Sequence, residues 1–99
     1  MKIEILAEAE QDLLDGMRFY ERQREGVGSY FRECLLADIK SLHRFAGVHA
    51  REHGYHRMVA KRFPFAVFYR VEGDRILVHA VLDCRRNPAW IRKRLARDL

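Results

Sequence analysis

The residues best suited to chemistry in this sequence are cationic, and they recur through its second half. The chain of 99 residues has 19 Lys and Arg against 14 Asp and Glu, so its formal net charge is +5. Guanidinium groups bind phosphates and carboxylates strongly, which favours an anionic partner. A merely solvated surface is the competing interpretation. The candidate target-binding residues are Arg57, Lys61, Arg62, Arg70, Arg85, Arg86 and Trp90.

Three histidines, His49, His53 and His56, have a spacing that resembles a metal-binding cluster. The first two stand four apart, as two ligands on one helical face do. No Cys or carboxylate completes the pattern and the stretch is not helical in character, so we expect exposed or hydrogen-bonding side chains. His43 and His79 are expected to pack against neighbours. The sequence therefore predicts no metal site, and no cofactor is expected.

Cys84 is the candidate nucleophile, because cationic Arg85 and Arg86 lie directly beside it. No His that could orient its thiol lies nearby in the sequence, so we expect a small residue at the end of a strand. Cys34 lies far from it and neither belongs to a CxxC motif, which predicts free thiols and a cytoplasmic protein. We assign no catalytic residue from the sequence.

The elements that must position these side chains begin with a strand and two helices. Residues 2–6 alternate apolar and charged, which is the period of a half-buried strand. Residues 7–23 repeat apolar side chains at helical spacing, and carboxylates fill the opening turns. A break at residues 26–28 precedes a second helix, for which Ser29 is the expected N-cap. The short break predicts an antiparallel helical hairpin.

The second half of the sequence indicates a sheet. Residues 46–54 are polar and without period, so we expect a loop there. Three runs rich in aromatic and β-branched residues follow, separated by turn signals. They predict sequential antiparallel strands at residues 55–61, 66–71 and 76–82. Strands paired in this order would gather the cationic residues into one concave patch.

A short basic helix should end the chain. Asn87 can cap it and Pro88 suits its first turn. Its cations are expected to be mainly structural, since positive charge stabilises a helix C-terminus; they are Arg92, Lys93, Arg94 and Arg97. The predicted order is β-α-α-β-β-β-α in one domain, residues 1–99. This is an α+β fold with a helical hairpin packed on a small, mostly antiparallel sheet.

The strand motif resembles the RelE/ParE superfamily of bacterial toxins, and within it the ParE-like plasmid-stabilisation branch. The resemblance rests on Tyr55-His56-Arg57, on the run that starts at Arg62-Phe63-Pro64-Phe65, and on the ending Arg85-Arg86-Asn87-Pro88. The acidic first helix and Gly28 with Phe31 in the second are similar too. The resemblance implies a cytoplasmic toxin of a type II toxin-antitoxin system, held inactive by a cognate ParD-like antitoxin.

The family divides by target, and the resemblance favours the branch that inhibits DNA gyrase and arrests growth. The alternative branch cleaves mRNA on the ribosome, using strand cations and often a Tyr or His near the C-terminus. Here Ala66 stands where that branch commonly has Arg, and neither Tyr nor His follows His79, although Arg86 matches a phosphate-stabilising Arg. Cleavage without a metal needs a positioned acid and base, so a non-hydrolytic protein is expected. An inactive member that still binds antitoxin is the third interpretation.

The resemblance also implies a complex. An acidic antitoxin is expected to lay a helix and a strand over the hairpin and the sheet edge, in a heterotetramer or larger assembly. No membrane is involved in this interpretation. The candidate antitoxin contacts are the apolar positions Leu13, Met17, Tyr20, Phe31 and Leu35.

Overall fold

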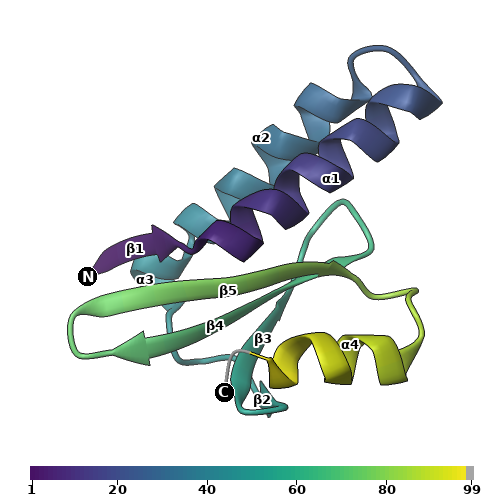
Figure 1. Ribbon diagram of the computed structural model, residues 1–99. Helices are drawn as coiled ribbons and strands as arrows, with labels where there is room; N and C mark the ends of the chain where they lie inside the picture. Colours follow the sequence, from purple (N-terminus) through teal and green to yellow (C-terminus); the bar gives the residue numbers. More distant parts are fainter. Residues whose placement is uncertain (98–99) are drawn as a thin grey trace.

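The computed structural model describes residues 1–97 and has the α+β architecture expected from the sequence (Figure 1). Residues 98–99, the end of the predicted domain, lie outside the described part of the chain. The elements are β1 (Lys2–Ile5), α1 (Ala7–Gln23), α2 (Val27–Lys40), α3 (Leu42–Phe45), β2 (Arg51–Glu52), β3 (Tyr55–Val59), β4 (Phe65–Glu72), β5 (Arg75–Asp83) and α4 (Pro88–Ala96).

The five strands form one sheet in the order β1-β5-β4-β3-β2. β1 runs parallel to β5, with Ile3 opposite Ile76, while each other neighbouring pair is antiparallel. The first strand of the sequence thus lies beside the last. Because α1 starts two residues after β1 ends, its first turns lie close to β5.

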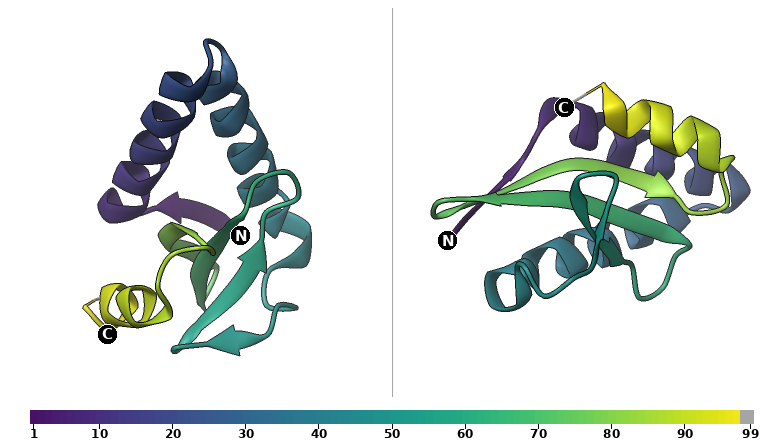
Figure 2. Two further views of the ribbon diagram at one scale, coloured as in Figure 1. Left: turned by 90° about the vertical axis from the view of Figure 1, so that its right-hand side faces the viewer. Right: turned by 90° about the horizontal axis from the view of Figure 1, so that it is seen from below.

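The α1–α2 hairpin covers one face of the sheet and α4 covers the other (Figures 1 and 2). An apolar core lies on each side of the sheet. Val67 and Tyr69 of β4 face the hairpin, whereas Ala66 and Phe68 face Leu95 of α4. The strand period therefore distributes a nearly continuous apolar run between two cores.

The β4–β5 register shifts between Phe68 and Tyr69, whose partners are Ala80 and Val78. His79 lies between these two pairs as the extra residue of a bulge. Its ring packs 4.9 Å from that of Tyr55, and it is buried. The prediction that His79 is a packing residue is confirmed.

Close packing of α1 on α2 depends on two glycines. A Cβ at Gly28 would lie 2.6 Å from the carbonyl oxygen of Met17, and one at Gly16 would lie 2.6 Å from the ring of Phe31. Both distances are shorter than side-chain contacts allow. The sequence therefore places glycine where the two helices approach each other most closely.

The turn between α1 and α2 differs from the expectation. α2 begins at Val27, so the predicted N-cap at Ser29 is wrong, and Gly26 precedes the helix with a φ of 89°. The carboxylate of Glu21 accepts hydrogen bonds from the N–H groups of Gly26 and Gly28, each at 3.0 Å. These bonds satisfy helix-start donors that Ser29 was expected to satisfy.

The stretch predicted as a loop at residues 46–54 contains the strand β2, which pairs with β3. His53 and Gly54 connect them with φ values of 56° and 84°, as a two-residue hairpin turn requires. Two strand residues are too few to show a period.

The expectation that His43 packs is also wrong, because on the one-turn helix α3 it is exposed while Leu42 is buried.

Candidate functional site

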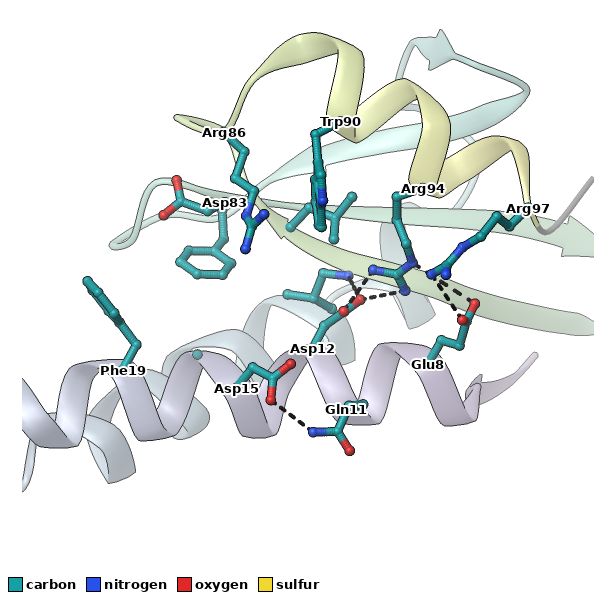
Figure 3. A pocket seen from close by; sticks show the side chains of 14 residues that line it. Glu8, Gln11, Asp12, Asp15, Phe19, Asp83, Arg86, Trp90, Arg94 and Arg97 are labelled. Atoms are coloured by element: carbon teal, nitrogen blue, oxygen red, sulfur yellow. Dashed lines mark hydrogen bonds and ion pairs between the residues drawn. The ribbon is translucent and has the colours of Figure 1, made fainter.

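An open groove of about 520 Å³ lies between α1, the end of β5 and α4 (Figure 3). Asn87 starts α4 there by accepting a hydrogen bond from the Ala89 N–H at 2.8 Å, as the sequence predicts. The walls of the groove are charged and its floor is apolar. Its lining includes Glu8, Gln11, Asp12, Asp15, Phe19, Phe65, Val81, Leu82, Asp83, Arg86, Trp90, Arg94 and Arg97.

Asp12 and Arg94 form a bidentate ion pair across the inner end of this groove. Arg94 Nη1 and Nη2 donate to Asp12 Oδ1 and Oδ2 at 2.8 and 2.9 Å. Their side chains are only 12% and 6% exposed. The N–H of Val81 also donates to Asp12 Oδ2, at 3.0 Å. One carboxylate therefore joins α1, β5 and α4.

Charge at this inner end is locally neutralised. Burial raises the pKa of Asp12, while the hydrogen bonds from Arg94 and from the Val81 N–H act in the opposite direction. One turn away, Arg97 donates to Glu8 at 3.2 Å. The sequence interpretation of Arg94 and Arg97 as mainly structural agrees with these contacts.

The other end of the groove is aromatic and cationic. The guanidinium carbon of Arg86 lies 3.8 Å from the centroid of the Trp90 ring, which is a cation–π contact. Trp90 is 39% exposed and Phe19, across the groove on α1, is 44% exposed. Among residues 1–97, Arg86 forms no ion pair. This end therefore offers apolar surface beside an available cation.

A second cavity, of about 150 Å³, lies between the β2–β3 turn and the start of α4. Arg57 and Arg86 line it together with His53, Glu52 and Cys84. Glu52 lies 3.7 Å from His53 Nε2 and 3.5 Å from Arg57 Nε, and Arg57 donates to the Cys84 sulfur at 3.4 Å. Two cations, a carboxylate and an imidazole thus meet in one small space.

The predicted cationic patch is divided between different parts of the surface. Arg57 and Arg86 meet at the second cavity, and Arg70 stacks on the ring of Tyr55 at 4.7 Å, facing the same side of the sheet. The remaining three cations lie toward the helical hairpin; they are Lys61, Arg62 and Arg85. The Lys61 N–H donates to Asp38 of α2. On the same helix, the hydrogen bond with Cys34 and then burial raise the pKa of Tyr30, while the nearby charge of Arg62 acts in the opposite direction.

Arg85 also lies apart from its neighbour Arg86. Its guanidinium binds Asp83 at 2.8 and 3.0 Å, and this ion pair, with a contribution from Tyr20 of α1, raises the pKa of Arg85. The two consecutive arginines therefore serve different sides of the molecule. A period-two argument could not predict this, because both follow the end of β5.

The five predicted antitoxin contacts contribute to the core. Leu13 is 7% exposed, Phe31 and Leu35 are fully buried, and Met17 and Tyr20 pack partly buried against them. Tyr20 stacks on Phe31 with centroids 5.2 Å apart. In this arrangement these side chains hold the hairpin on the sheet, and the exposed aromatic residue of α1 beside them is Phe19.

Sequence reasoning missed Phe19, Asp15, Asp83 and the pairing of Asp12 with Arg94. The carboxylates of α1 fitted a helix N-terminus, and nothing local indicated that one of them binds a residue 82 positions away. For Phe19 the sequence held only a weak indication of an exposed aromatic side chain. It is an aromatic residue next to the apolar stripe of an otherwise charged helix.

The histidines and cysteines take the following positions. His49 and His56 make hydrogen bonds and His53 is exposed, which confirms the expectation for all three. Within residues 1–97 there is no group of three His, Cys, Asp or Glu side chains placed to hold a metal ion. Cys34 and Cys84 are free thiols, as expected. No helix in that part of the chain has the length and apolar character needed to cross a membrane.

Comparison with known proteins adds one finding about the architecture, an α+β fold whose helical hairpin and C-terminal helix cover opposite faces of the sheet. Neither a protein-family model nor a curated protein matches the sequence. A solved chain described as "Chromosomal ParDE TA system from P. aeruginosa" shares this architecture with a TM-score of 0.74. The likeness covers 82% of this chain and 92% of that chain, at 19% sequence identity. The ParE/RelE-like fold expected from the strand motif is confirmed.

Proposed function

We propose that this protein is the toxin of a type II toxin-antitoxin pair and acts by binding DNA gyrase. The observation that carries the proposal is the fold shared with a chain of the ParDE toxin-antitoxin system. The strand motif from Tyr55 to Asn87 adds separate support, because it rests on residue types and their order, whereas the shared fold rests on backbone geometry. A binding mechanism needs an exposed surface and no acid–base pair, and the cationic face of the sheet around Arg57, Arg70 and Arg86 offers such a surface.

The antitoxin is proposed to occupy this groove. Its apolar floor and the exposed rings of Phe19 and Trp90 suit an apolar anchor side chain. Arg86, which stacks on Trp90, suits a carboxylate next to that anchor. The proposed antitoxin contact therefore moves from the five core positions to the exposed residues of the groove, and the proposed antitoxin remains acidic. A heterotetramer or larger assembly remains the proposed stoichiometry.

The target is proposed to bind the cationic side of the sheet. Arg57, Arg70 and Arg86 lie on the face that carries α4, where two of the three guanidiniums are supported by aromatic rings. Stacking restricts a long side chain before it binds, so less entropy is lost in the complex. Lys61, Arg62 and Arg85, toward the hairpin, are proposed to contribute less.

A second candidate function is cleavage of mRNA on the ribosome, and one observation favours it. His53, held at 3.7 Å from Glu52, lines the same cavity as Arg57 and Arg86. An imidazole next to two guanidiniums could transfer a proton while they stabilise a phosphate. This His lies before β3, outside the C-terminal segment that supplies such a group in the nuclease branch. We assign no second acid–base group to the cavity, and gyrase binding stays the first proposal.

Induction of the chain in a bacterium tests the proposal, with labelled thymidine and methionine incorporation followed over the first minutes. We expect thymidine incorporation to fall first and co-expression of the protein encoded beside this chain to restore growth. An earlier fall in methionine incorporation would replace gyrase with the ribosome. Normal growth, with the antitoxin still recovered as a complex, would identify an inactive member and overturn the toxin assignment.

A further inference from the structure

Three rings meet where residues 46–54 close over the sheet. Tyr69 of β4 is fully buried, and its hydroxyl oxygen accepts a hydrogen bond from the Gly47 N–H at 3.0 Å. Nδ1 of His49 lies 2.5 Å from the same oxygen. The ring of His56 on β3 stacks on Tyr69, with centroids 5.1 Å apart. This cluster lines neither the groove nor the second cavity.

The hydrogen-bond geometry assigns the protons of this cluster to particular atoms. A Tyr hydroxyl has one proton to donate, and the Gly47 N–H already uses its oxygen as an acceptor. Within residues 1–97, His49 Nδ1 is the acceptor placed to receive the Tyr69 proton. His49 is therefore neutral, with its own proton on Nε2. Protonation of Nδ1 would direct a second hydrogen at the hydroxyl and leave the buried O–H without its acceptor, which is costly.

The surroundings of His49 also disfavour a protonated imidazole. The titratable groups that face it are Tyr69 on β4 and His56 on β3, whose Nδ1 donates to the His49 carbonyl oxygen at 2.7 Å. Arg51 of β2 is the cross-strand partner of His56, so their side chains share a face. Burial, and then the charge of His56, lowers the pKa of His49.

We propose that the His49–Tyr69 contact is an acid-sensitive latch, which holds residues 46–54 on the sheet while His49 is neutral and releases them when it is protonated. The folded state lowers the pKa of His49 below its ordinary value of 6.5. The latch is therefore complete above pH 6.5, and it is lost as the pH falls to the pKa that His49 has in the folded state. Between pH 6.5 and that lower pKa, the equilibrium constant for opening of the segment rises about tenfold for each unit by which the pH falls. Release would also open the second cavity, since Glu52 and His53 belong to this segment.

Amide hydrogen exchange of the whole chain tests the latch at about pH 7.5 and about pH 5.5, corrected for the intrinsic exchange rate. The reporters are the amides of Gly47, which donates to Tyr69, and Arg57, which donates to the Ala50 carbonyl. We expect their protection to fall, by at most about tenfold, while amides between β4 and β5 change little. His49→Gln should remove the fall. His43→Gln, at an exposed His on α3, should retain it.

Tyr69→Phe supplies a second test that does not depend on the His49 variant folding well. It keeps the ring and removes the hydroxyl, so Gly47 should exchange faster already at about pH 7.5, and the acid step at Gly47 and Arg57 should disappear. A uniform fall in protection across the sheet would overturn the latch. So would an acid step of full size in either His49→Gln or Tyr69→Phe.

Discussion

Arg94 of α4 binds Asp12 of α1 through two parallel hydrogen bonds of 2.8 and 2.9 Å, although 82 positions separate them in the sequence. The Val81 N–H donates to the same carboxylate. Because the pair joins the two helices that form the walls of the groove, it sets the distance between them (Figure 3). The geometry of the proposed partner site thus depends on one buried ion pair.

Loss of either member of this pair should be strongly destabilising. Asp12→Ala removes both short hydrogen bonds of the buried Arg94, whose contact with Glu8 is 4.0 Å long, and Arg94→Ala removes the guanidinium that binds the Asp12 carboxylate. We expect either change to cost about 3–5 kcal/mol in the free energy of unfolding, measured with urea. The double variant Asp12→Leu with Arg94→Leu should recover much of the loss. Glu4→Gln is the control, because the Glu4–Arg75 pair is exposed and should matter little. Equal effects of the buried and exposed changes would contradict the assignment.

A methyl group at Gly28 should separate the hairpin helices. Ala favours a helix over Gly, yet the added Cβ would lie 2.6 Å from the Met17 carbonyl oxygen, and backbone cannot rotate away. We expect Gly28→Ala to destabilise by about 1–3 kcal/mol in thermal or urea unfolding. Ser29→Ala, one residue further on at an exposed position, serves as the control. A stabilised Gly28→Ala protein would show that the helices are less closely packed.

Antitoxin binding should depend on Phe19 and far less on an equally exposed Phe elsewhere. Phe19→Ser removes the ring that faces the groove, and we expect an affinity loss of about 2 kcal/mol, or roughly 30-fold, by calorimetry. Phe45→Ser on α3 is the matched control, since the two rings are 44% and 47% exposed and Phe45 does not line the groove. Equal losses from both variants would place the partner elsewhere.

Growth arrest should depend on Arg86. Arg86→Ala removes the guanidinium shared by the groove and the second cavity. We expect the inducer dose needed to arrest growth to rise about tenfold or more. Arg92→Ala changes an exposed cation on α4 outside both cavities and should retain arrest. Full arrest by Arg86→Ala would remove this residue from the target contact.

His53 separates the two candidate functions. If the protein binds gyrase without hydrolysis, His53→Gln keeps a polar side chain in the cavity and should arrest growth as the natural chain does. If the imidazole transfers a proton, the variant should lose mRNA cleavage by about 100-fold or more while it still binds the antitoxin. The readouts are arrest in cells, mRNA cleavage on translating ribosomes and a pull-down with the antitoxin.

The sequence predicted most of the fold because its signals were local. Alternation at residues 2–6, the helical stripe before Gly26 and the turn at Glu72-Gly73-Asp74 each determine a neighbouring backbone, and the elements appeared in the expected order. The strand β2 escaped prediction since two residues carry no period. Ser29 failed as a cap because Glu21, from the preceding helix, bonds the helix-start donors.

The site was harder to predict because its contacts are distant in sequence. Leu13, Phe31 and Leu35 were identified as apolar, but an apolar stripe does not distinguish a core from a docking surface. The parallel pairing of β1 with β5 brings α1 to α4, and no local pattern reports that pairing. The shared position of His53, Arg57 and Arg86 follows instead from the antiparallel pairing of β2, β3, β4 and β5.

Purified protein mixed with DNA gyrase, ATP and plasmid tests the central proposal most directly, with detergent added before electrophoresis to release any trapped cleaved DNA. The account predicts linear DNA that increases with the amount of this protein, and none when the antitoxin is added first. Unimpaired supercoiling without cleaved DNA, together with mRNA cut in a parallel reaction on translating ribosomes, would contradict it and establish the endonuclease.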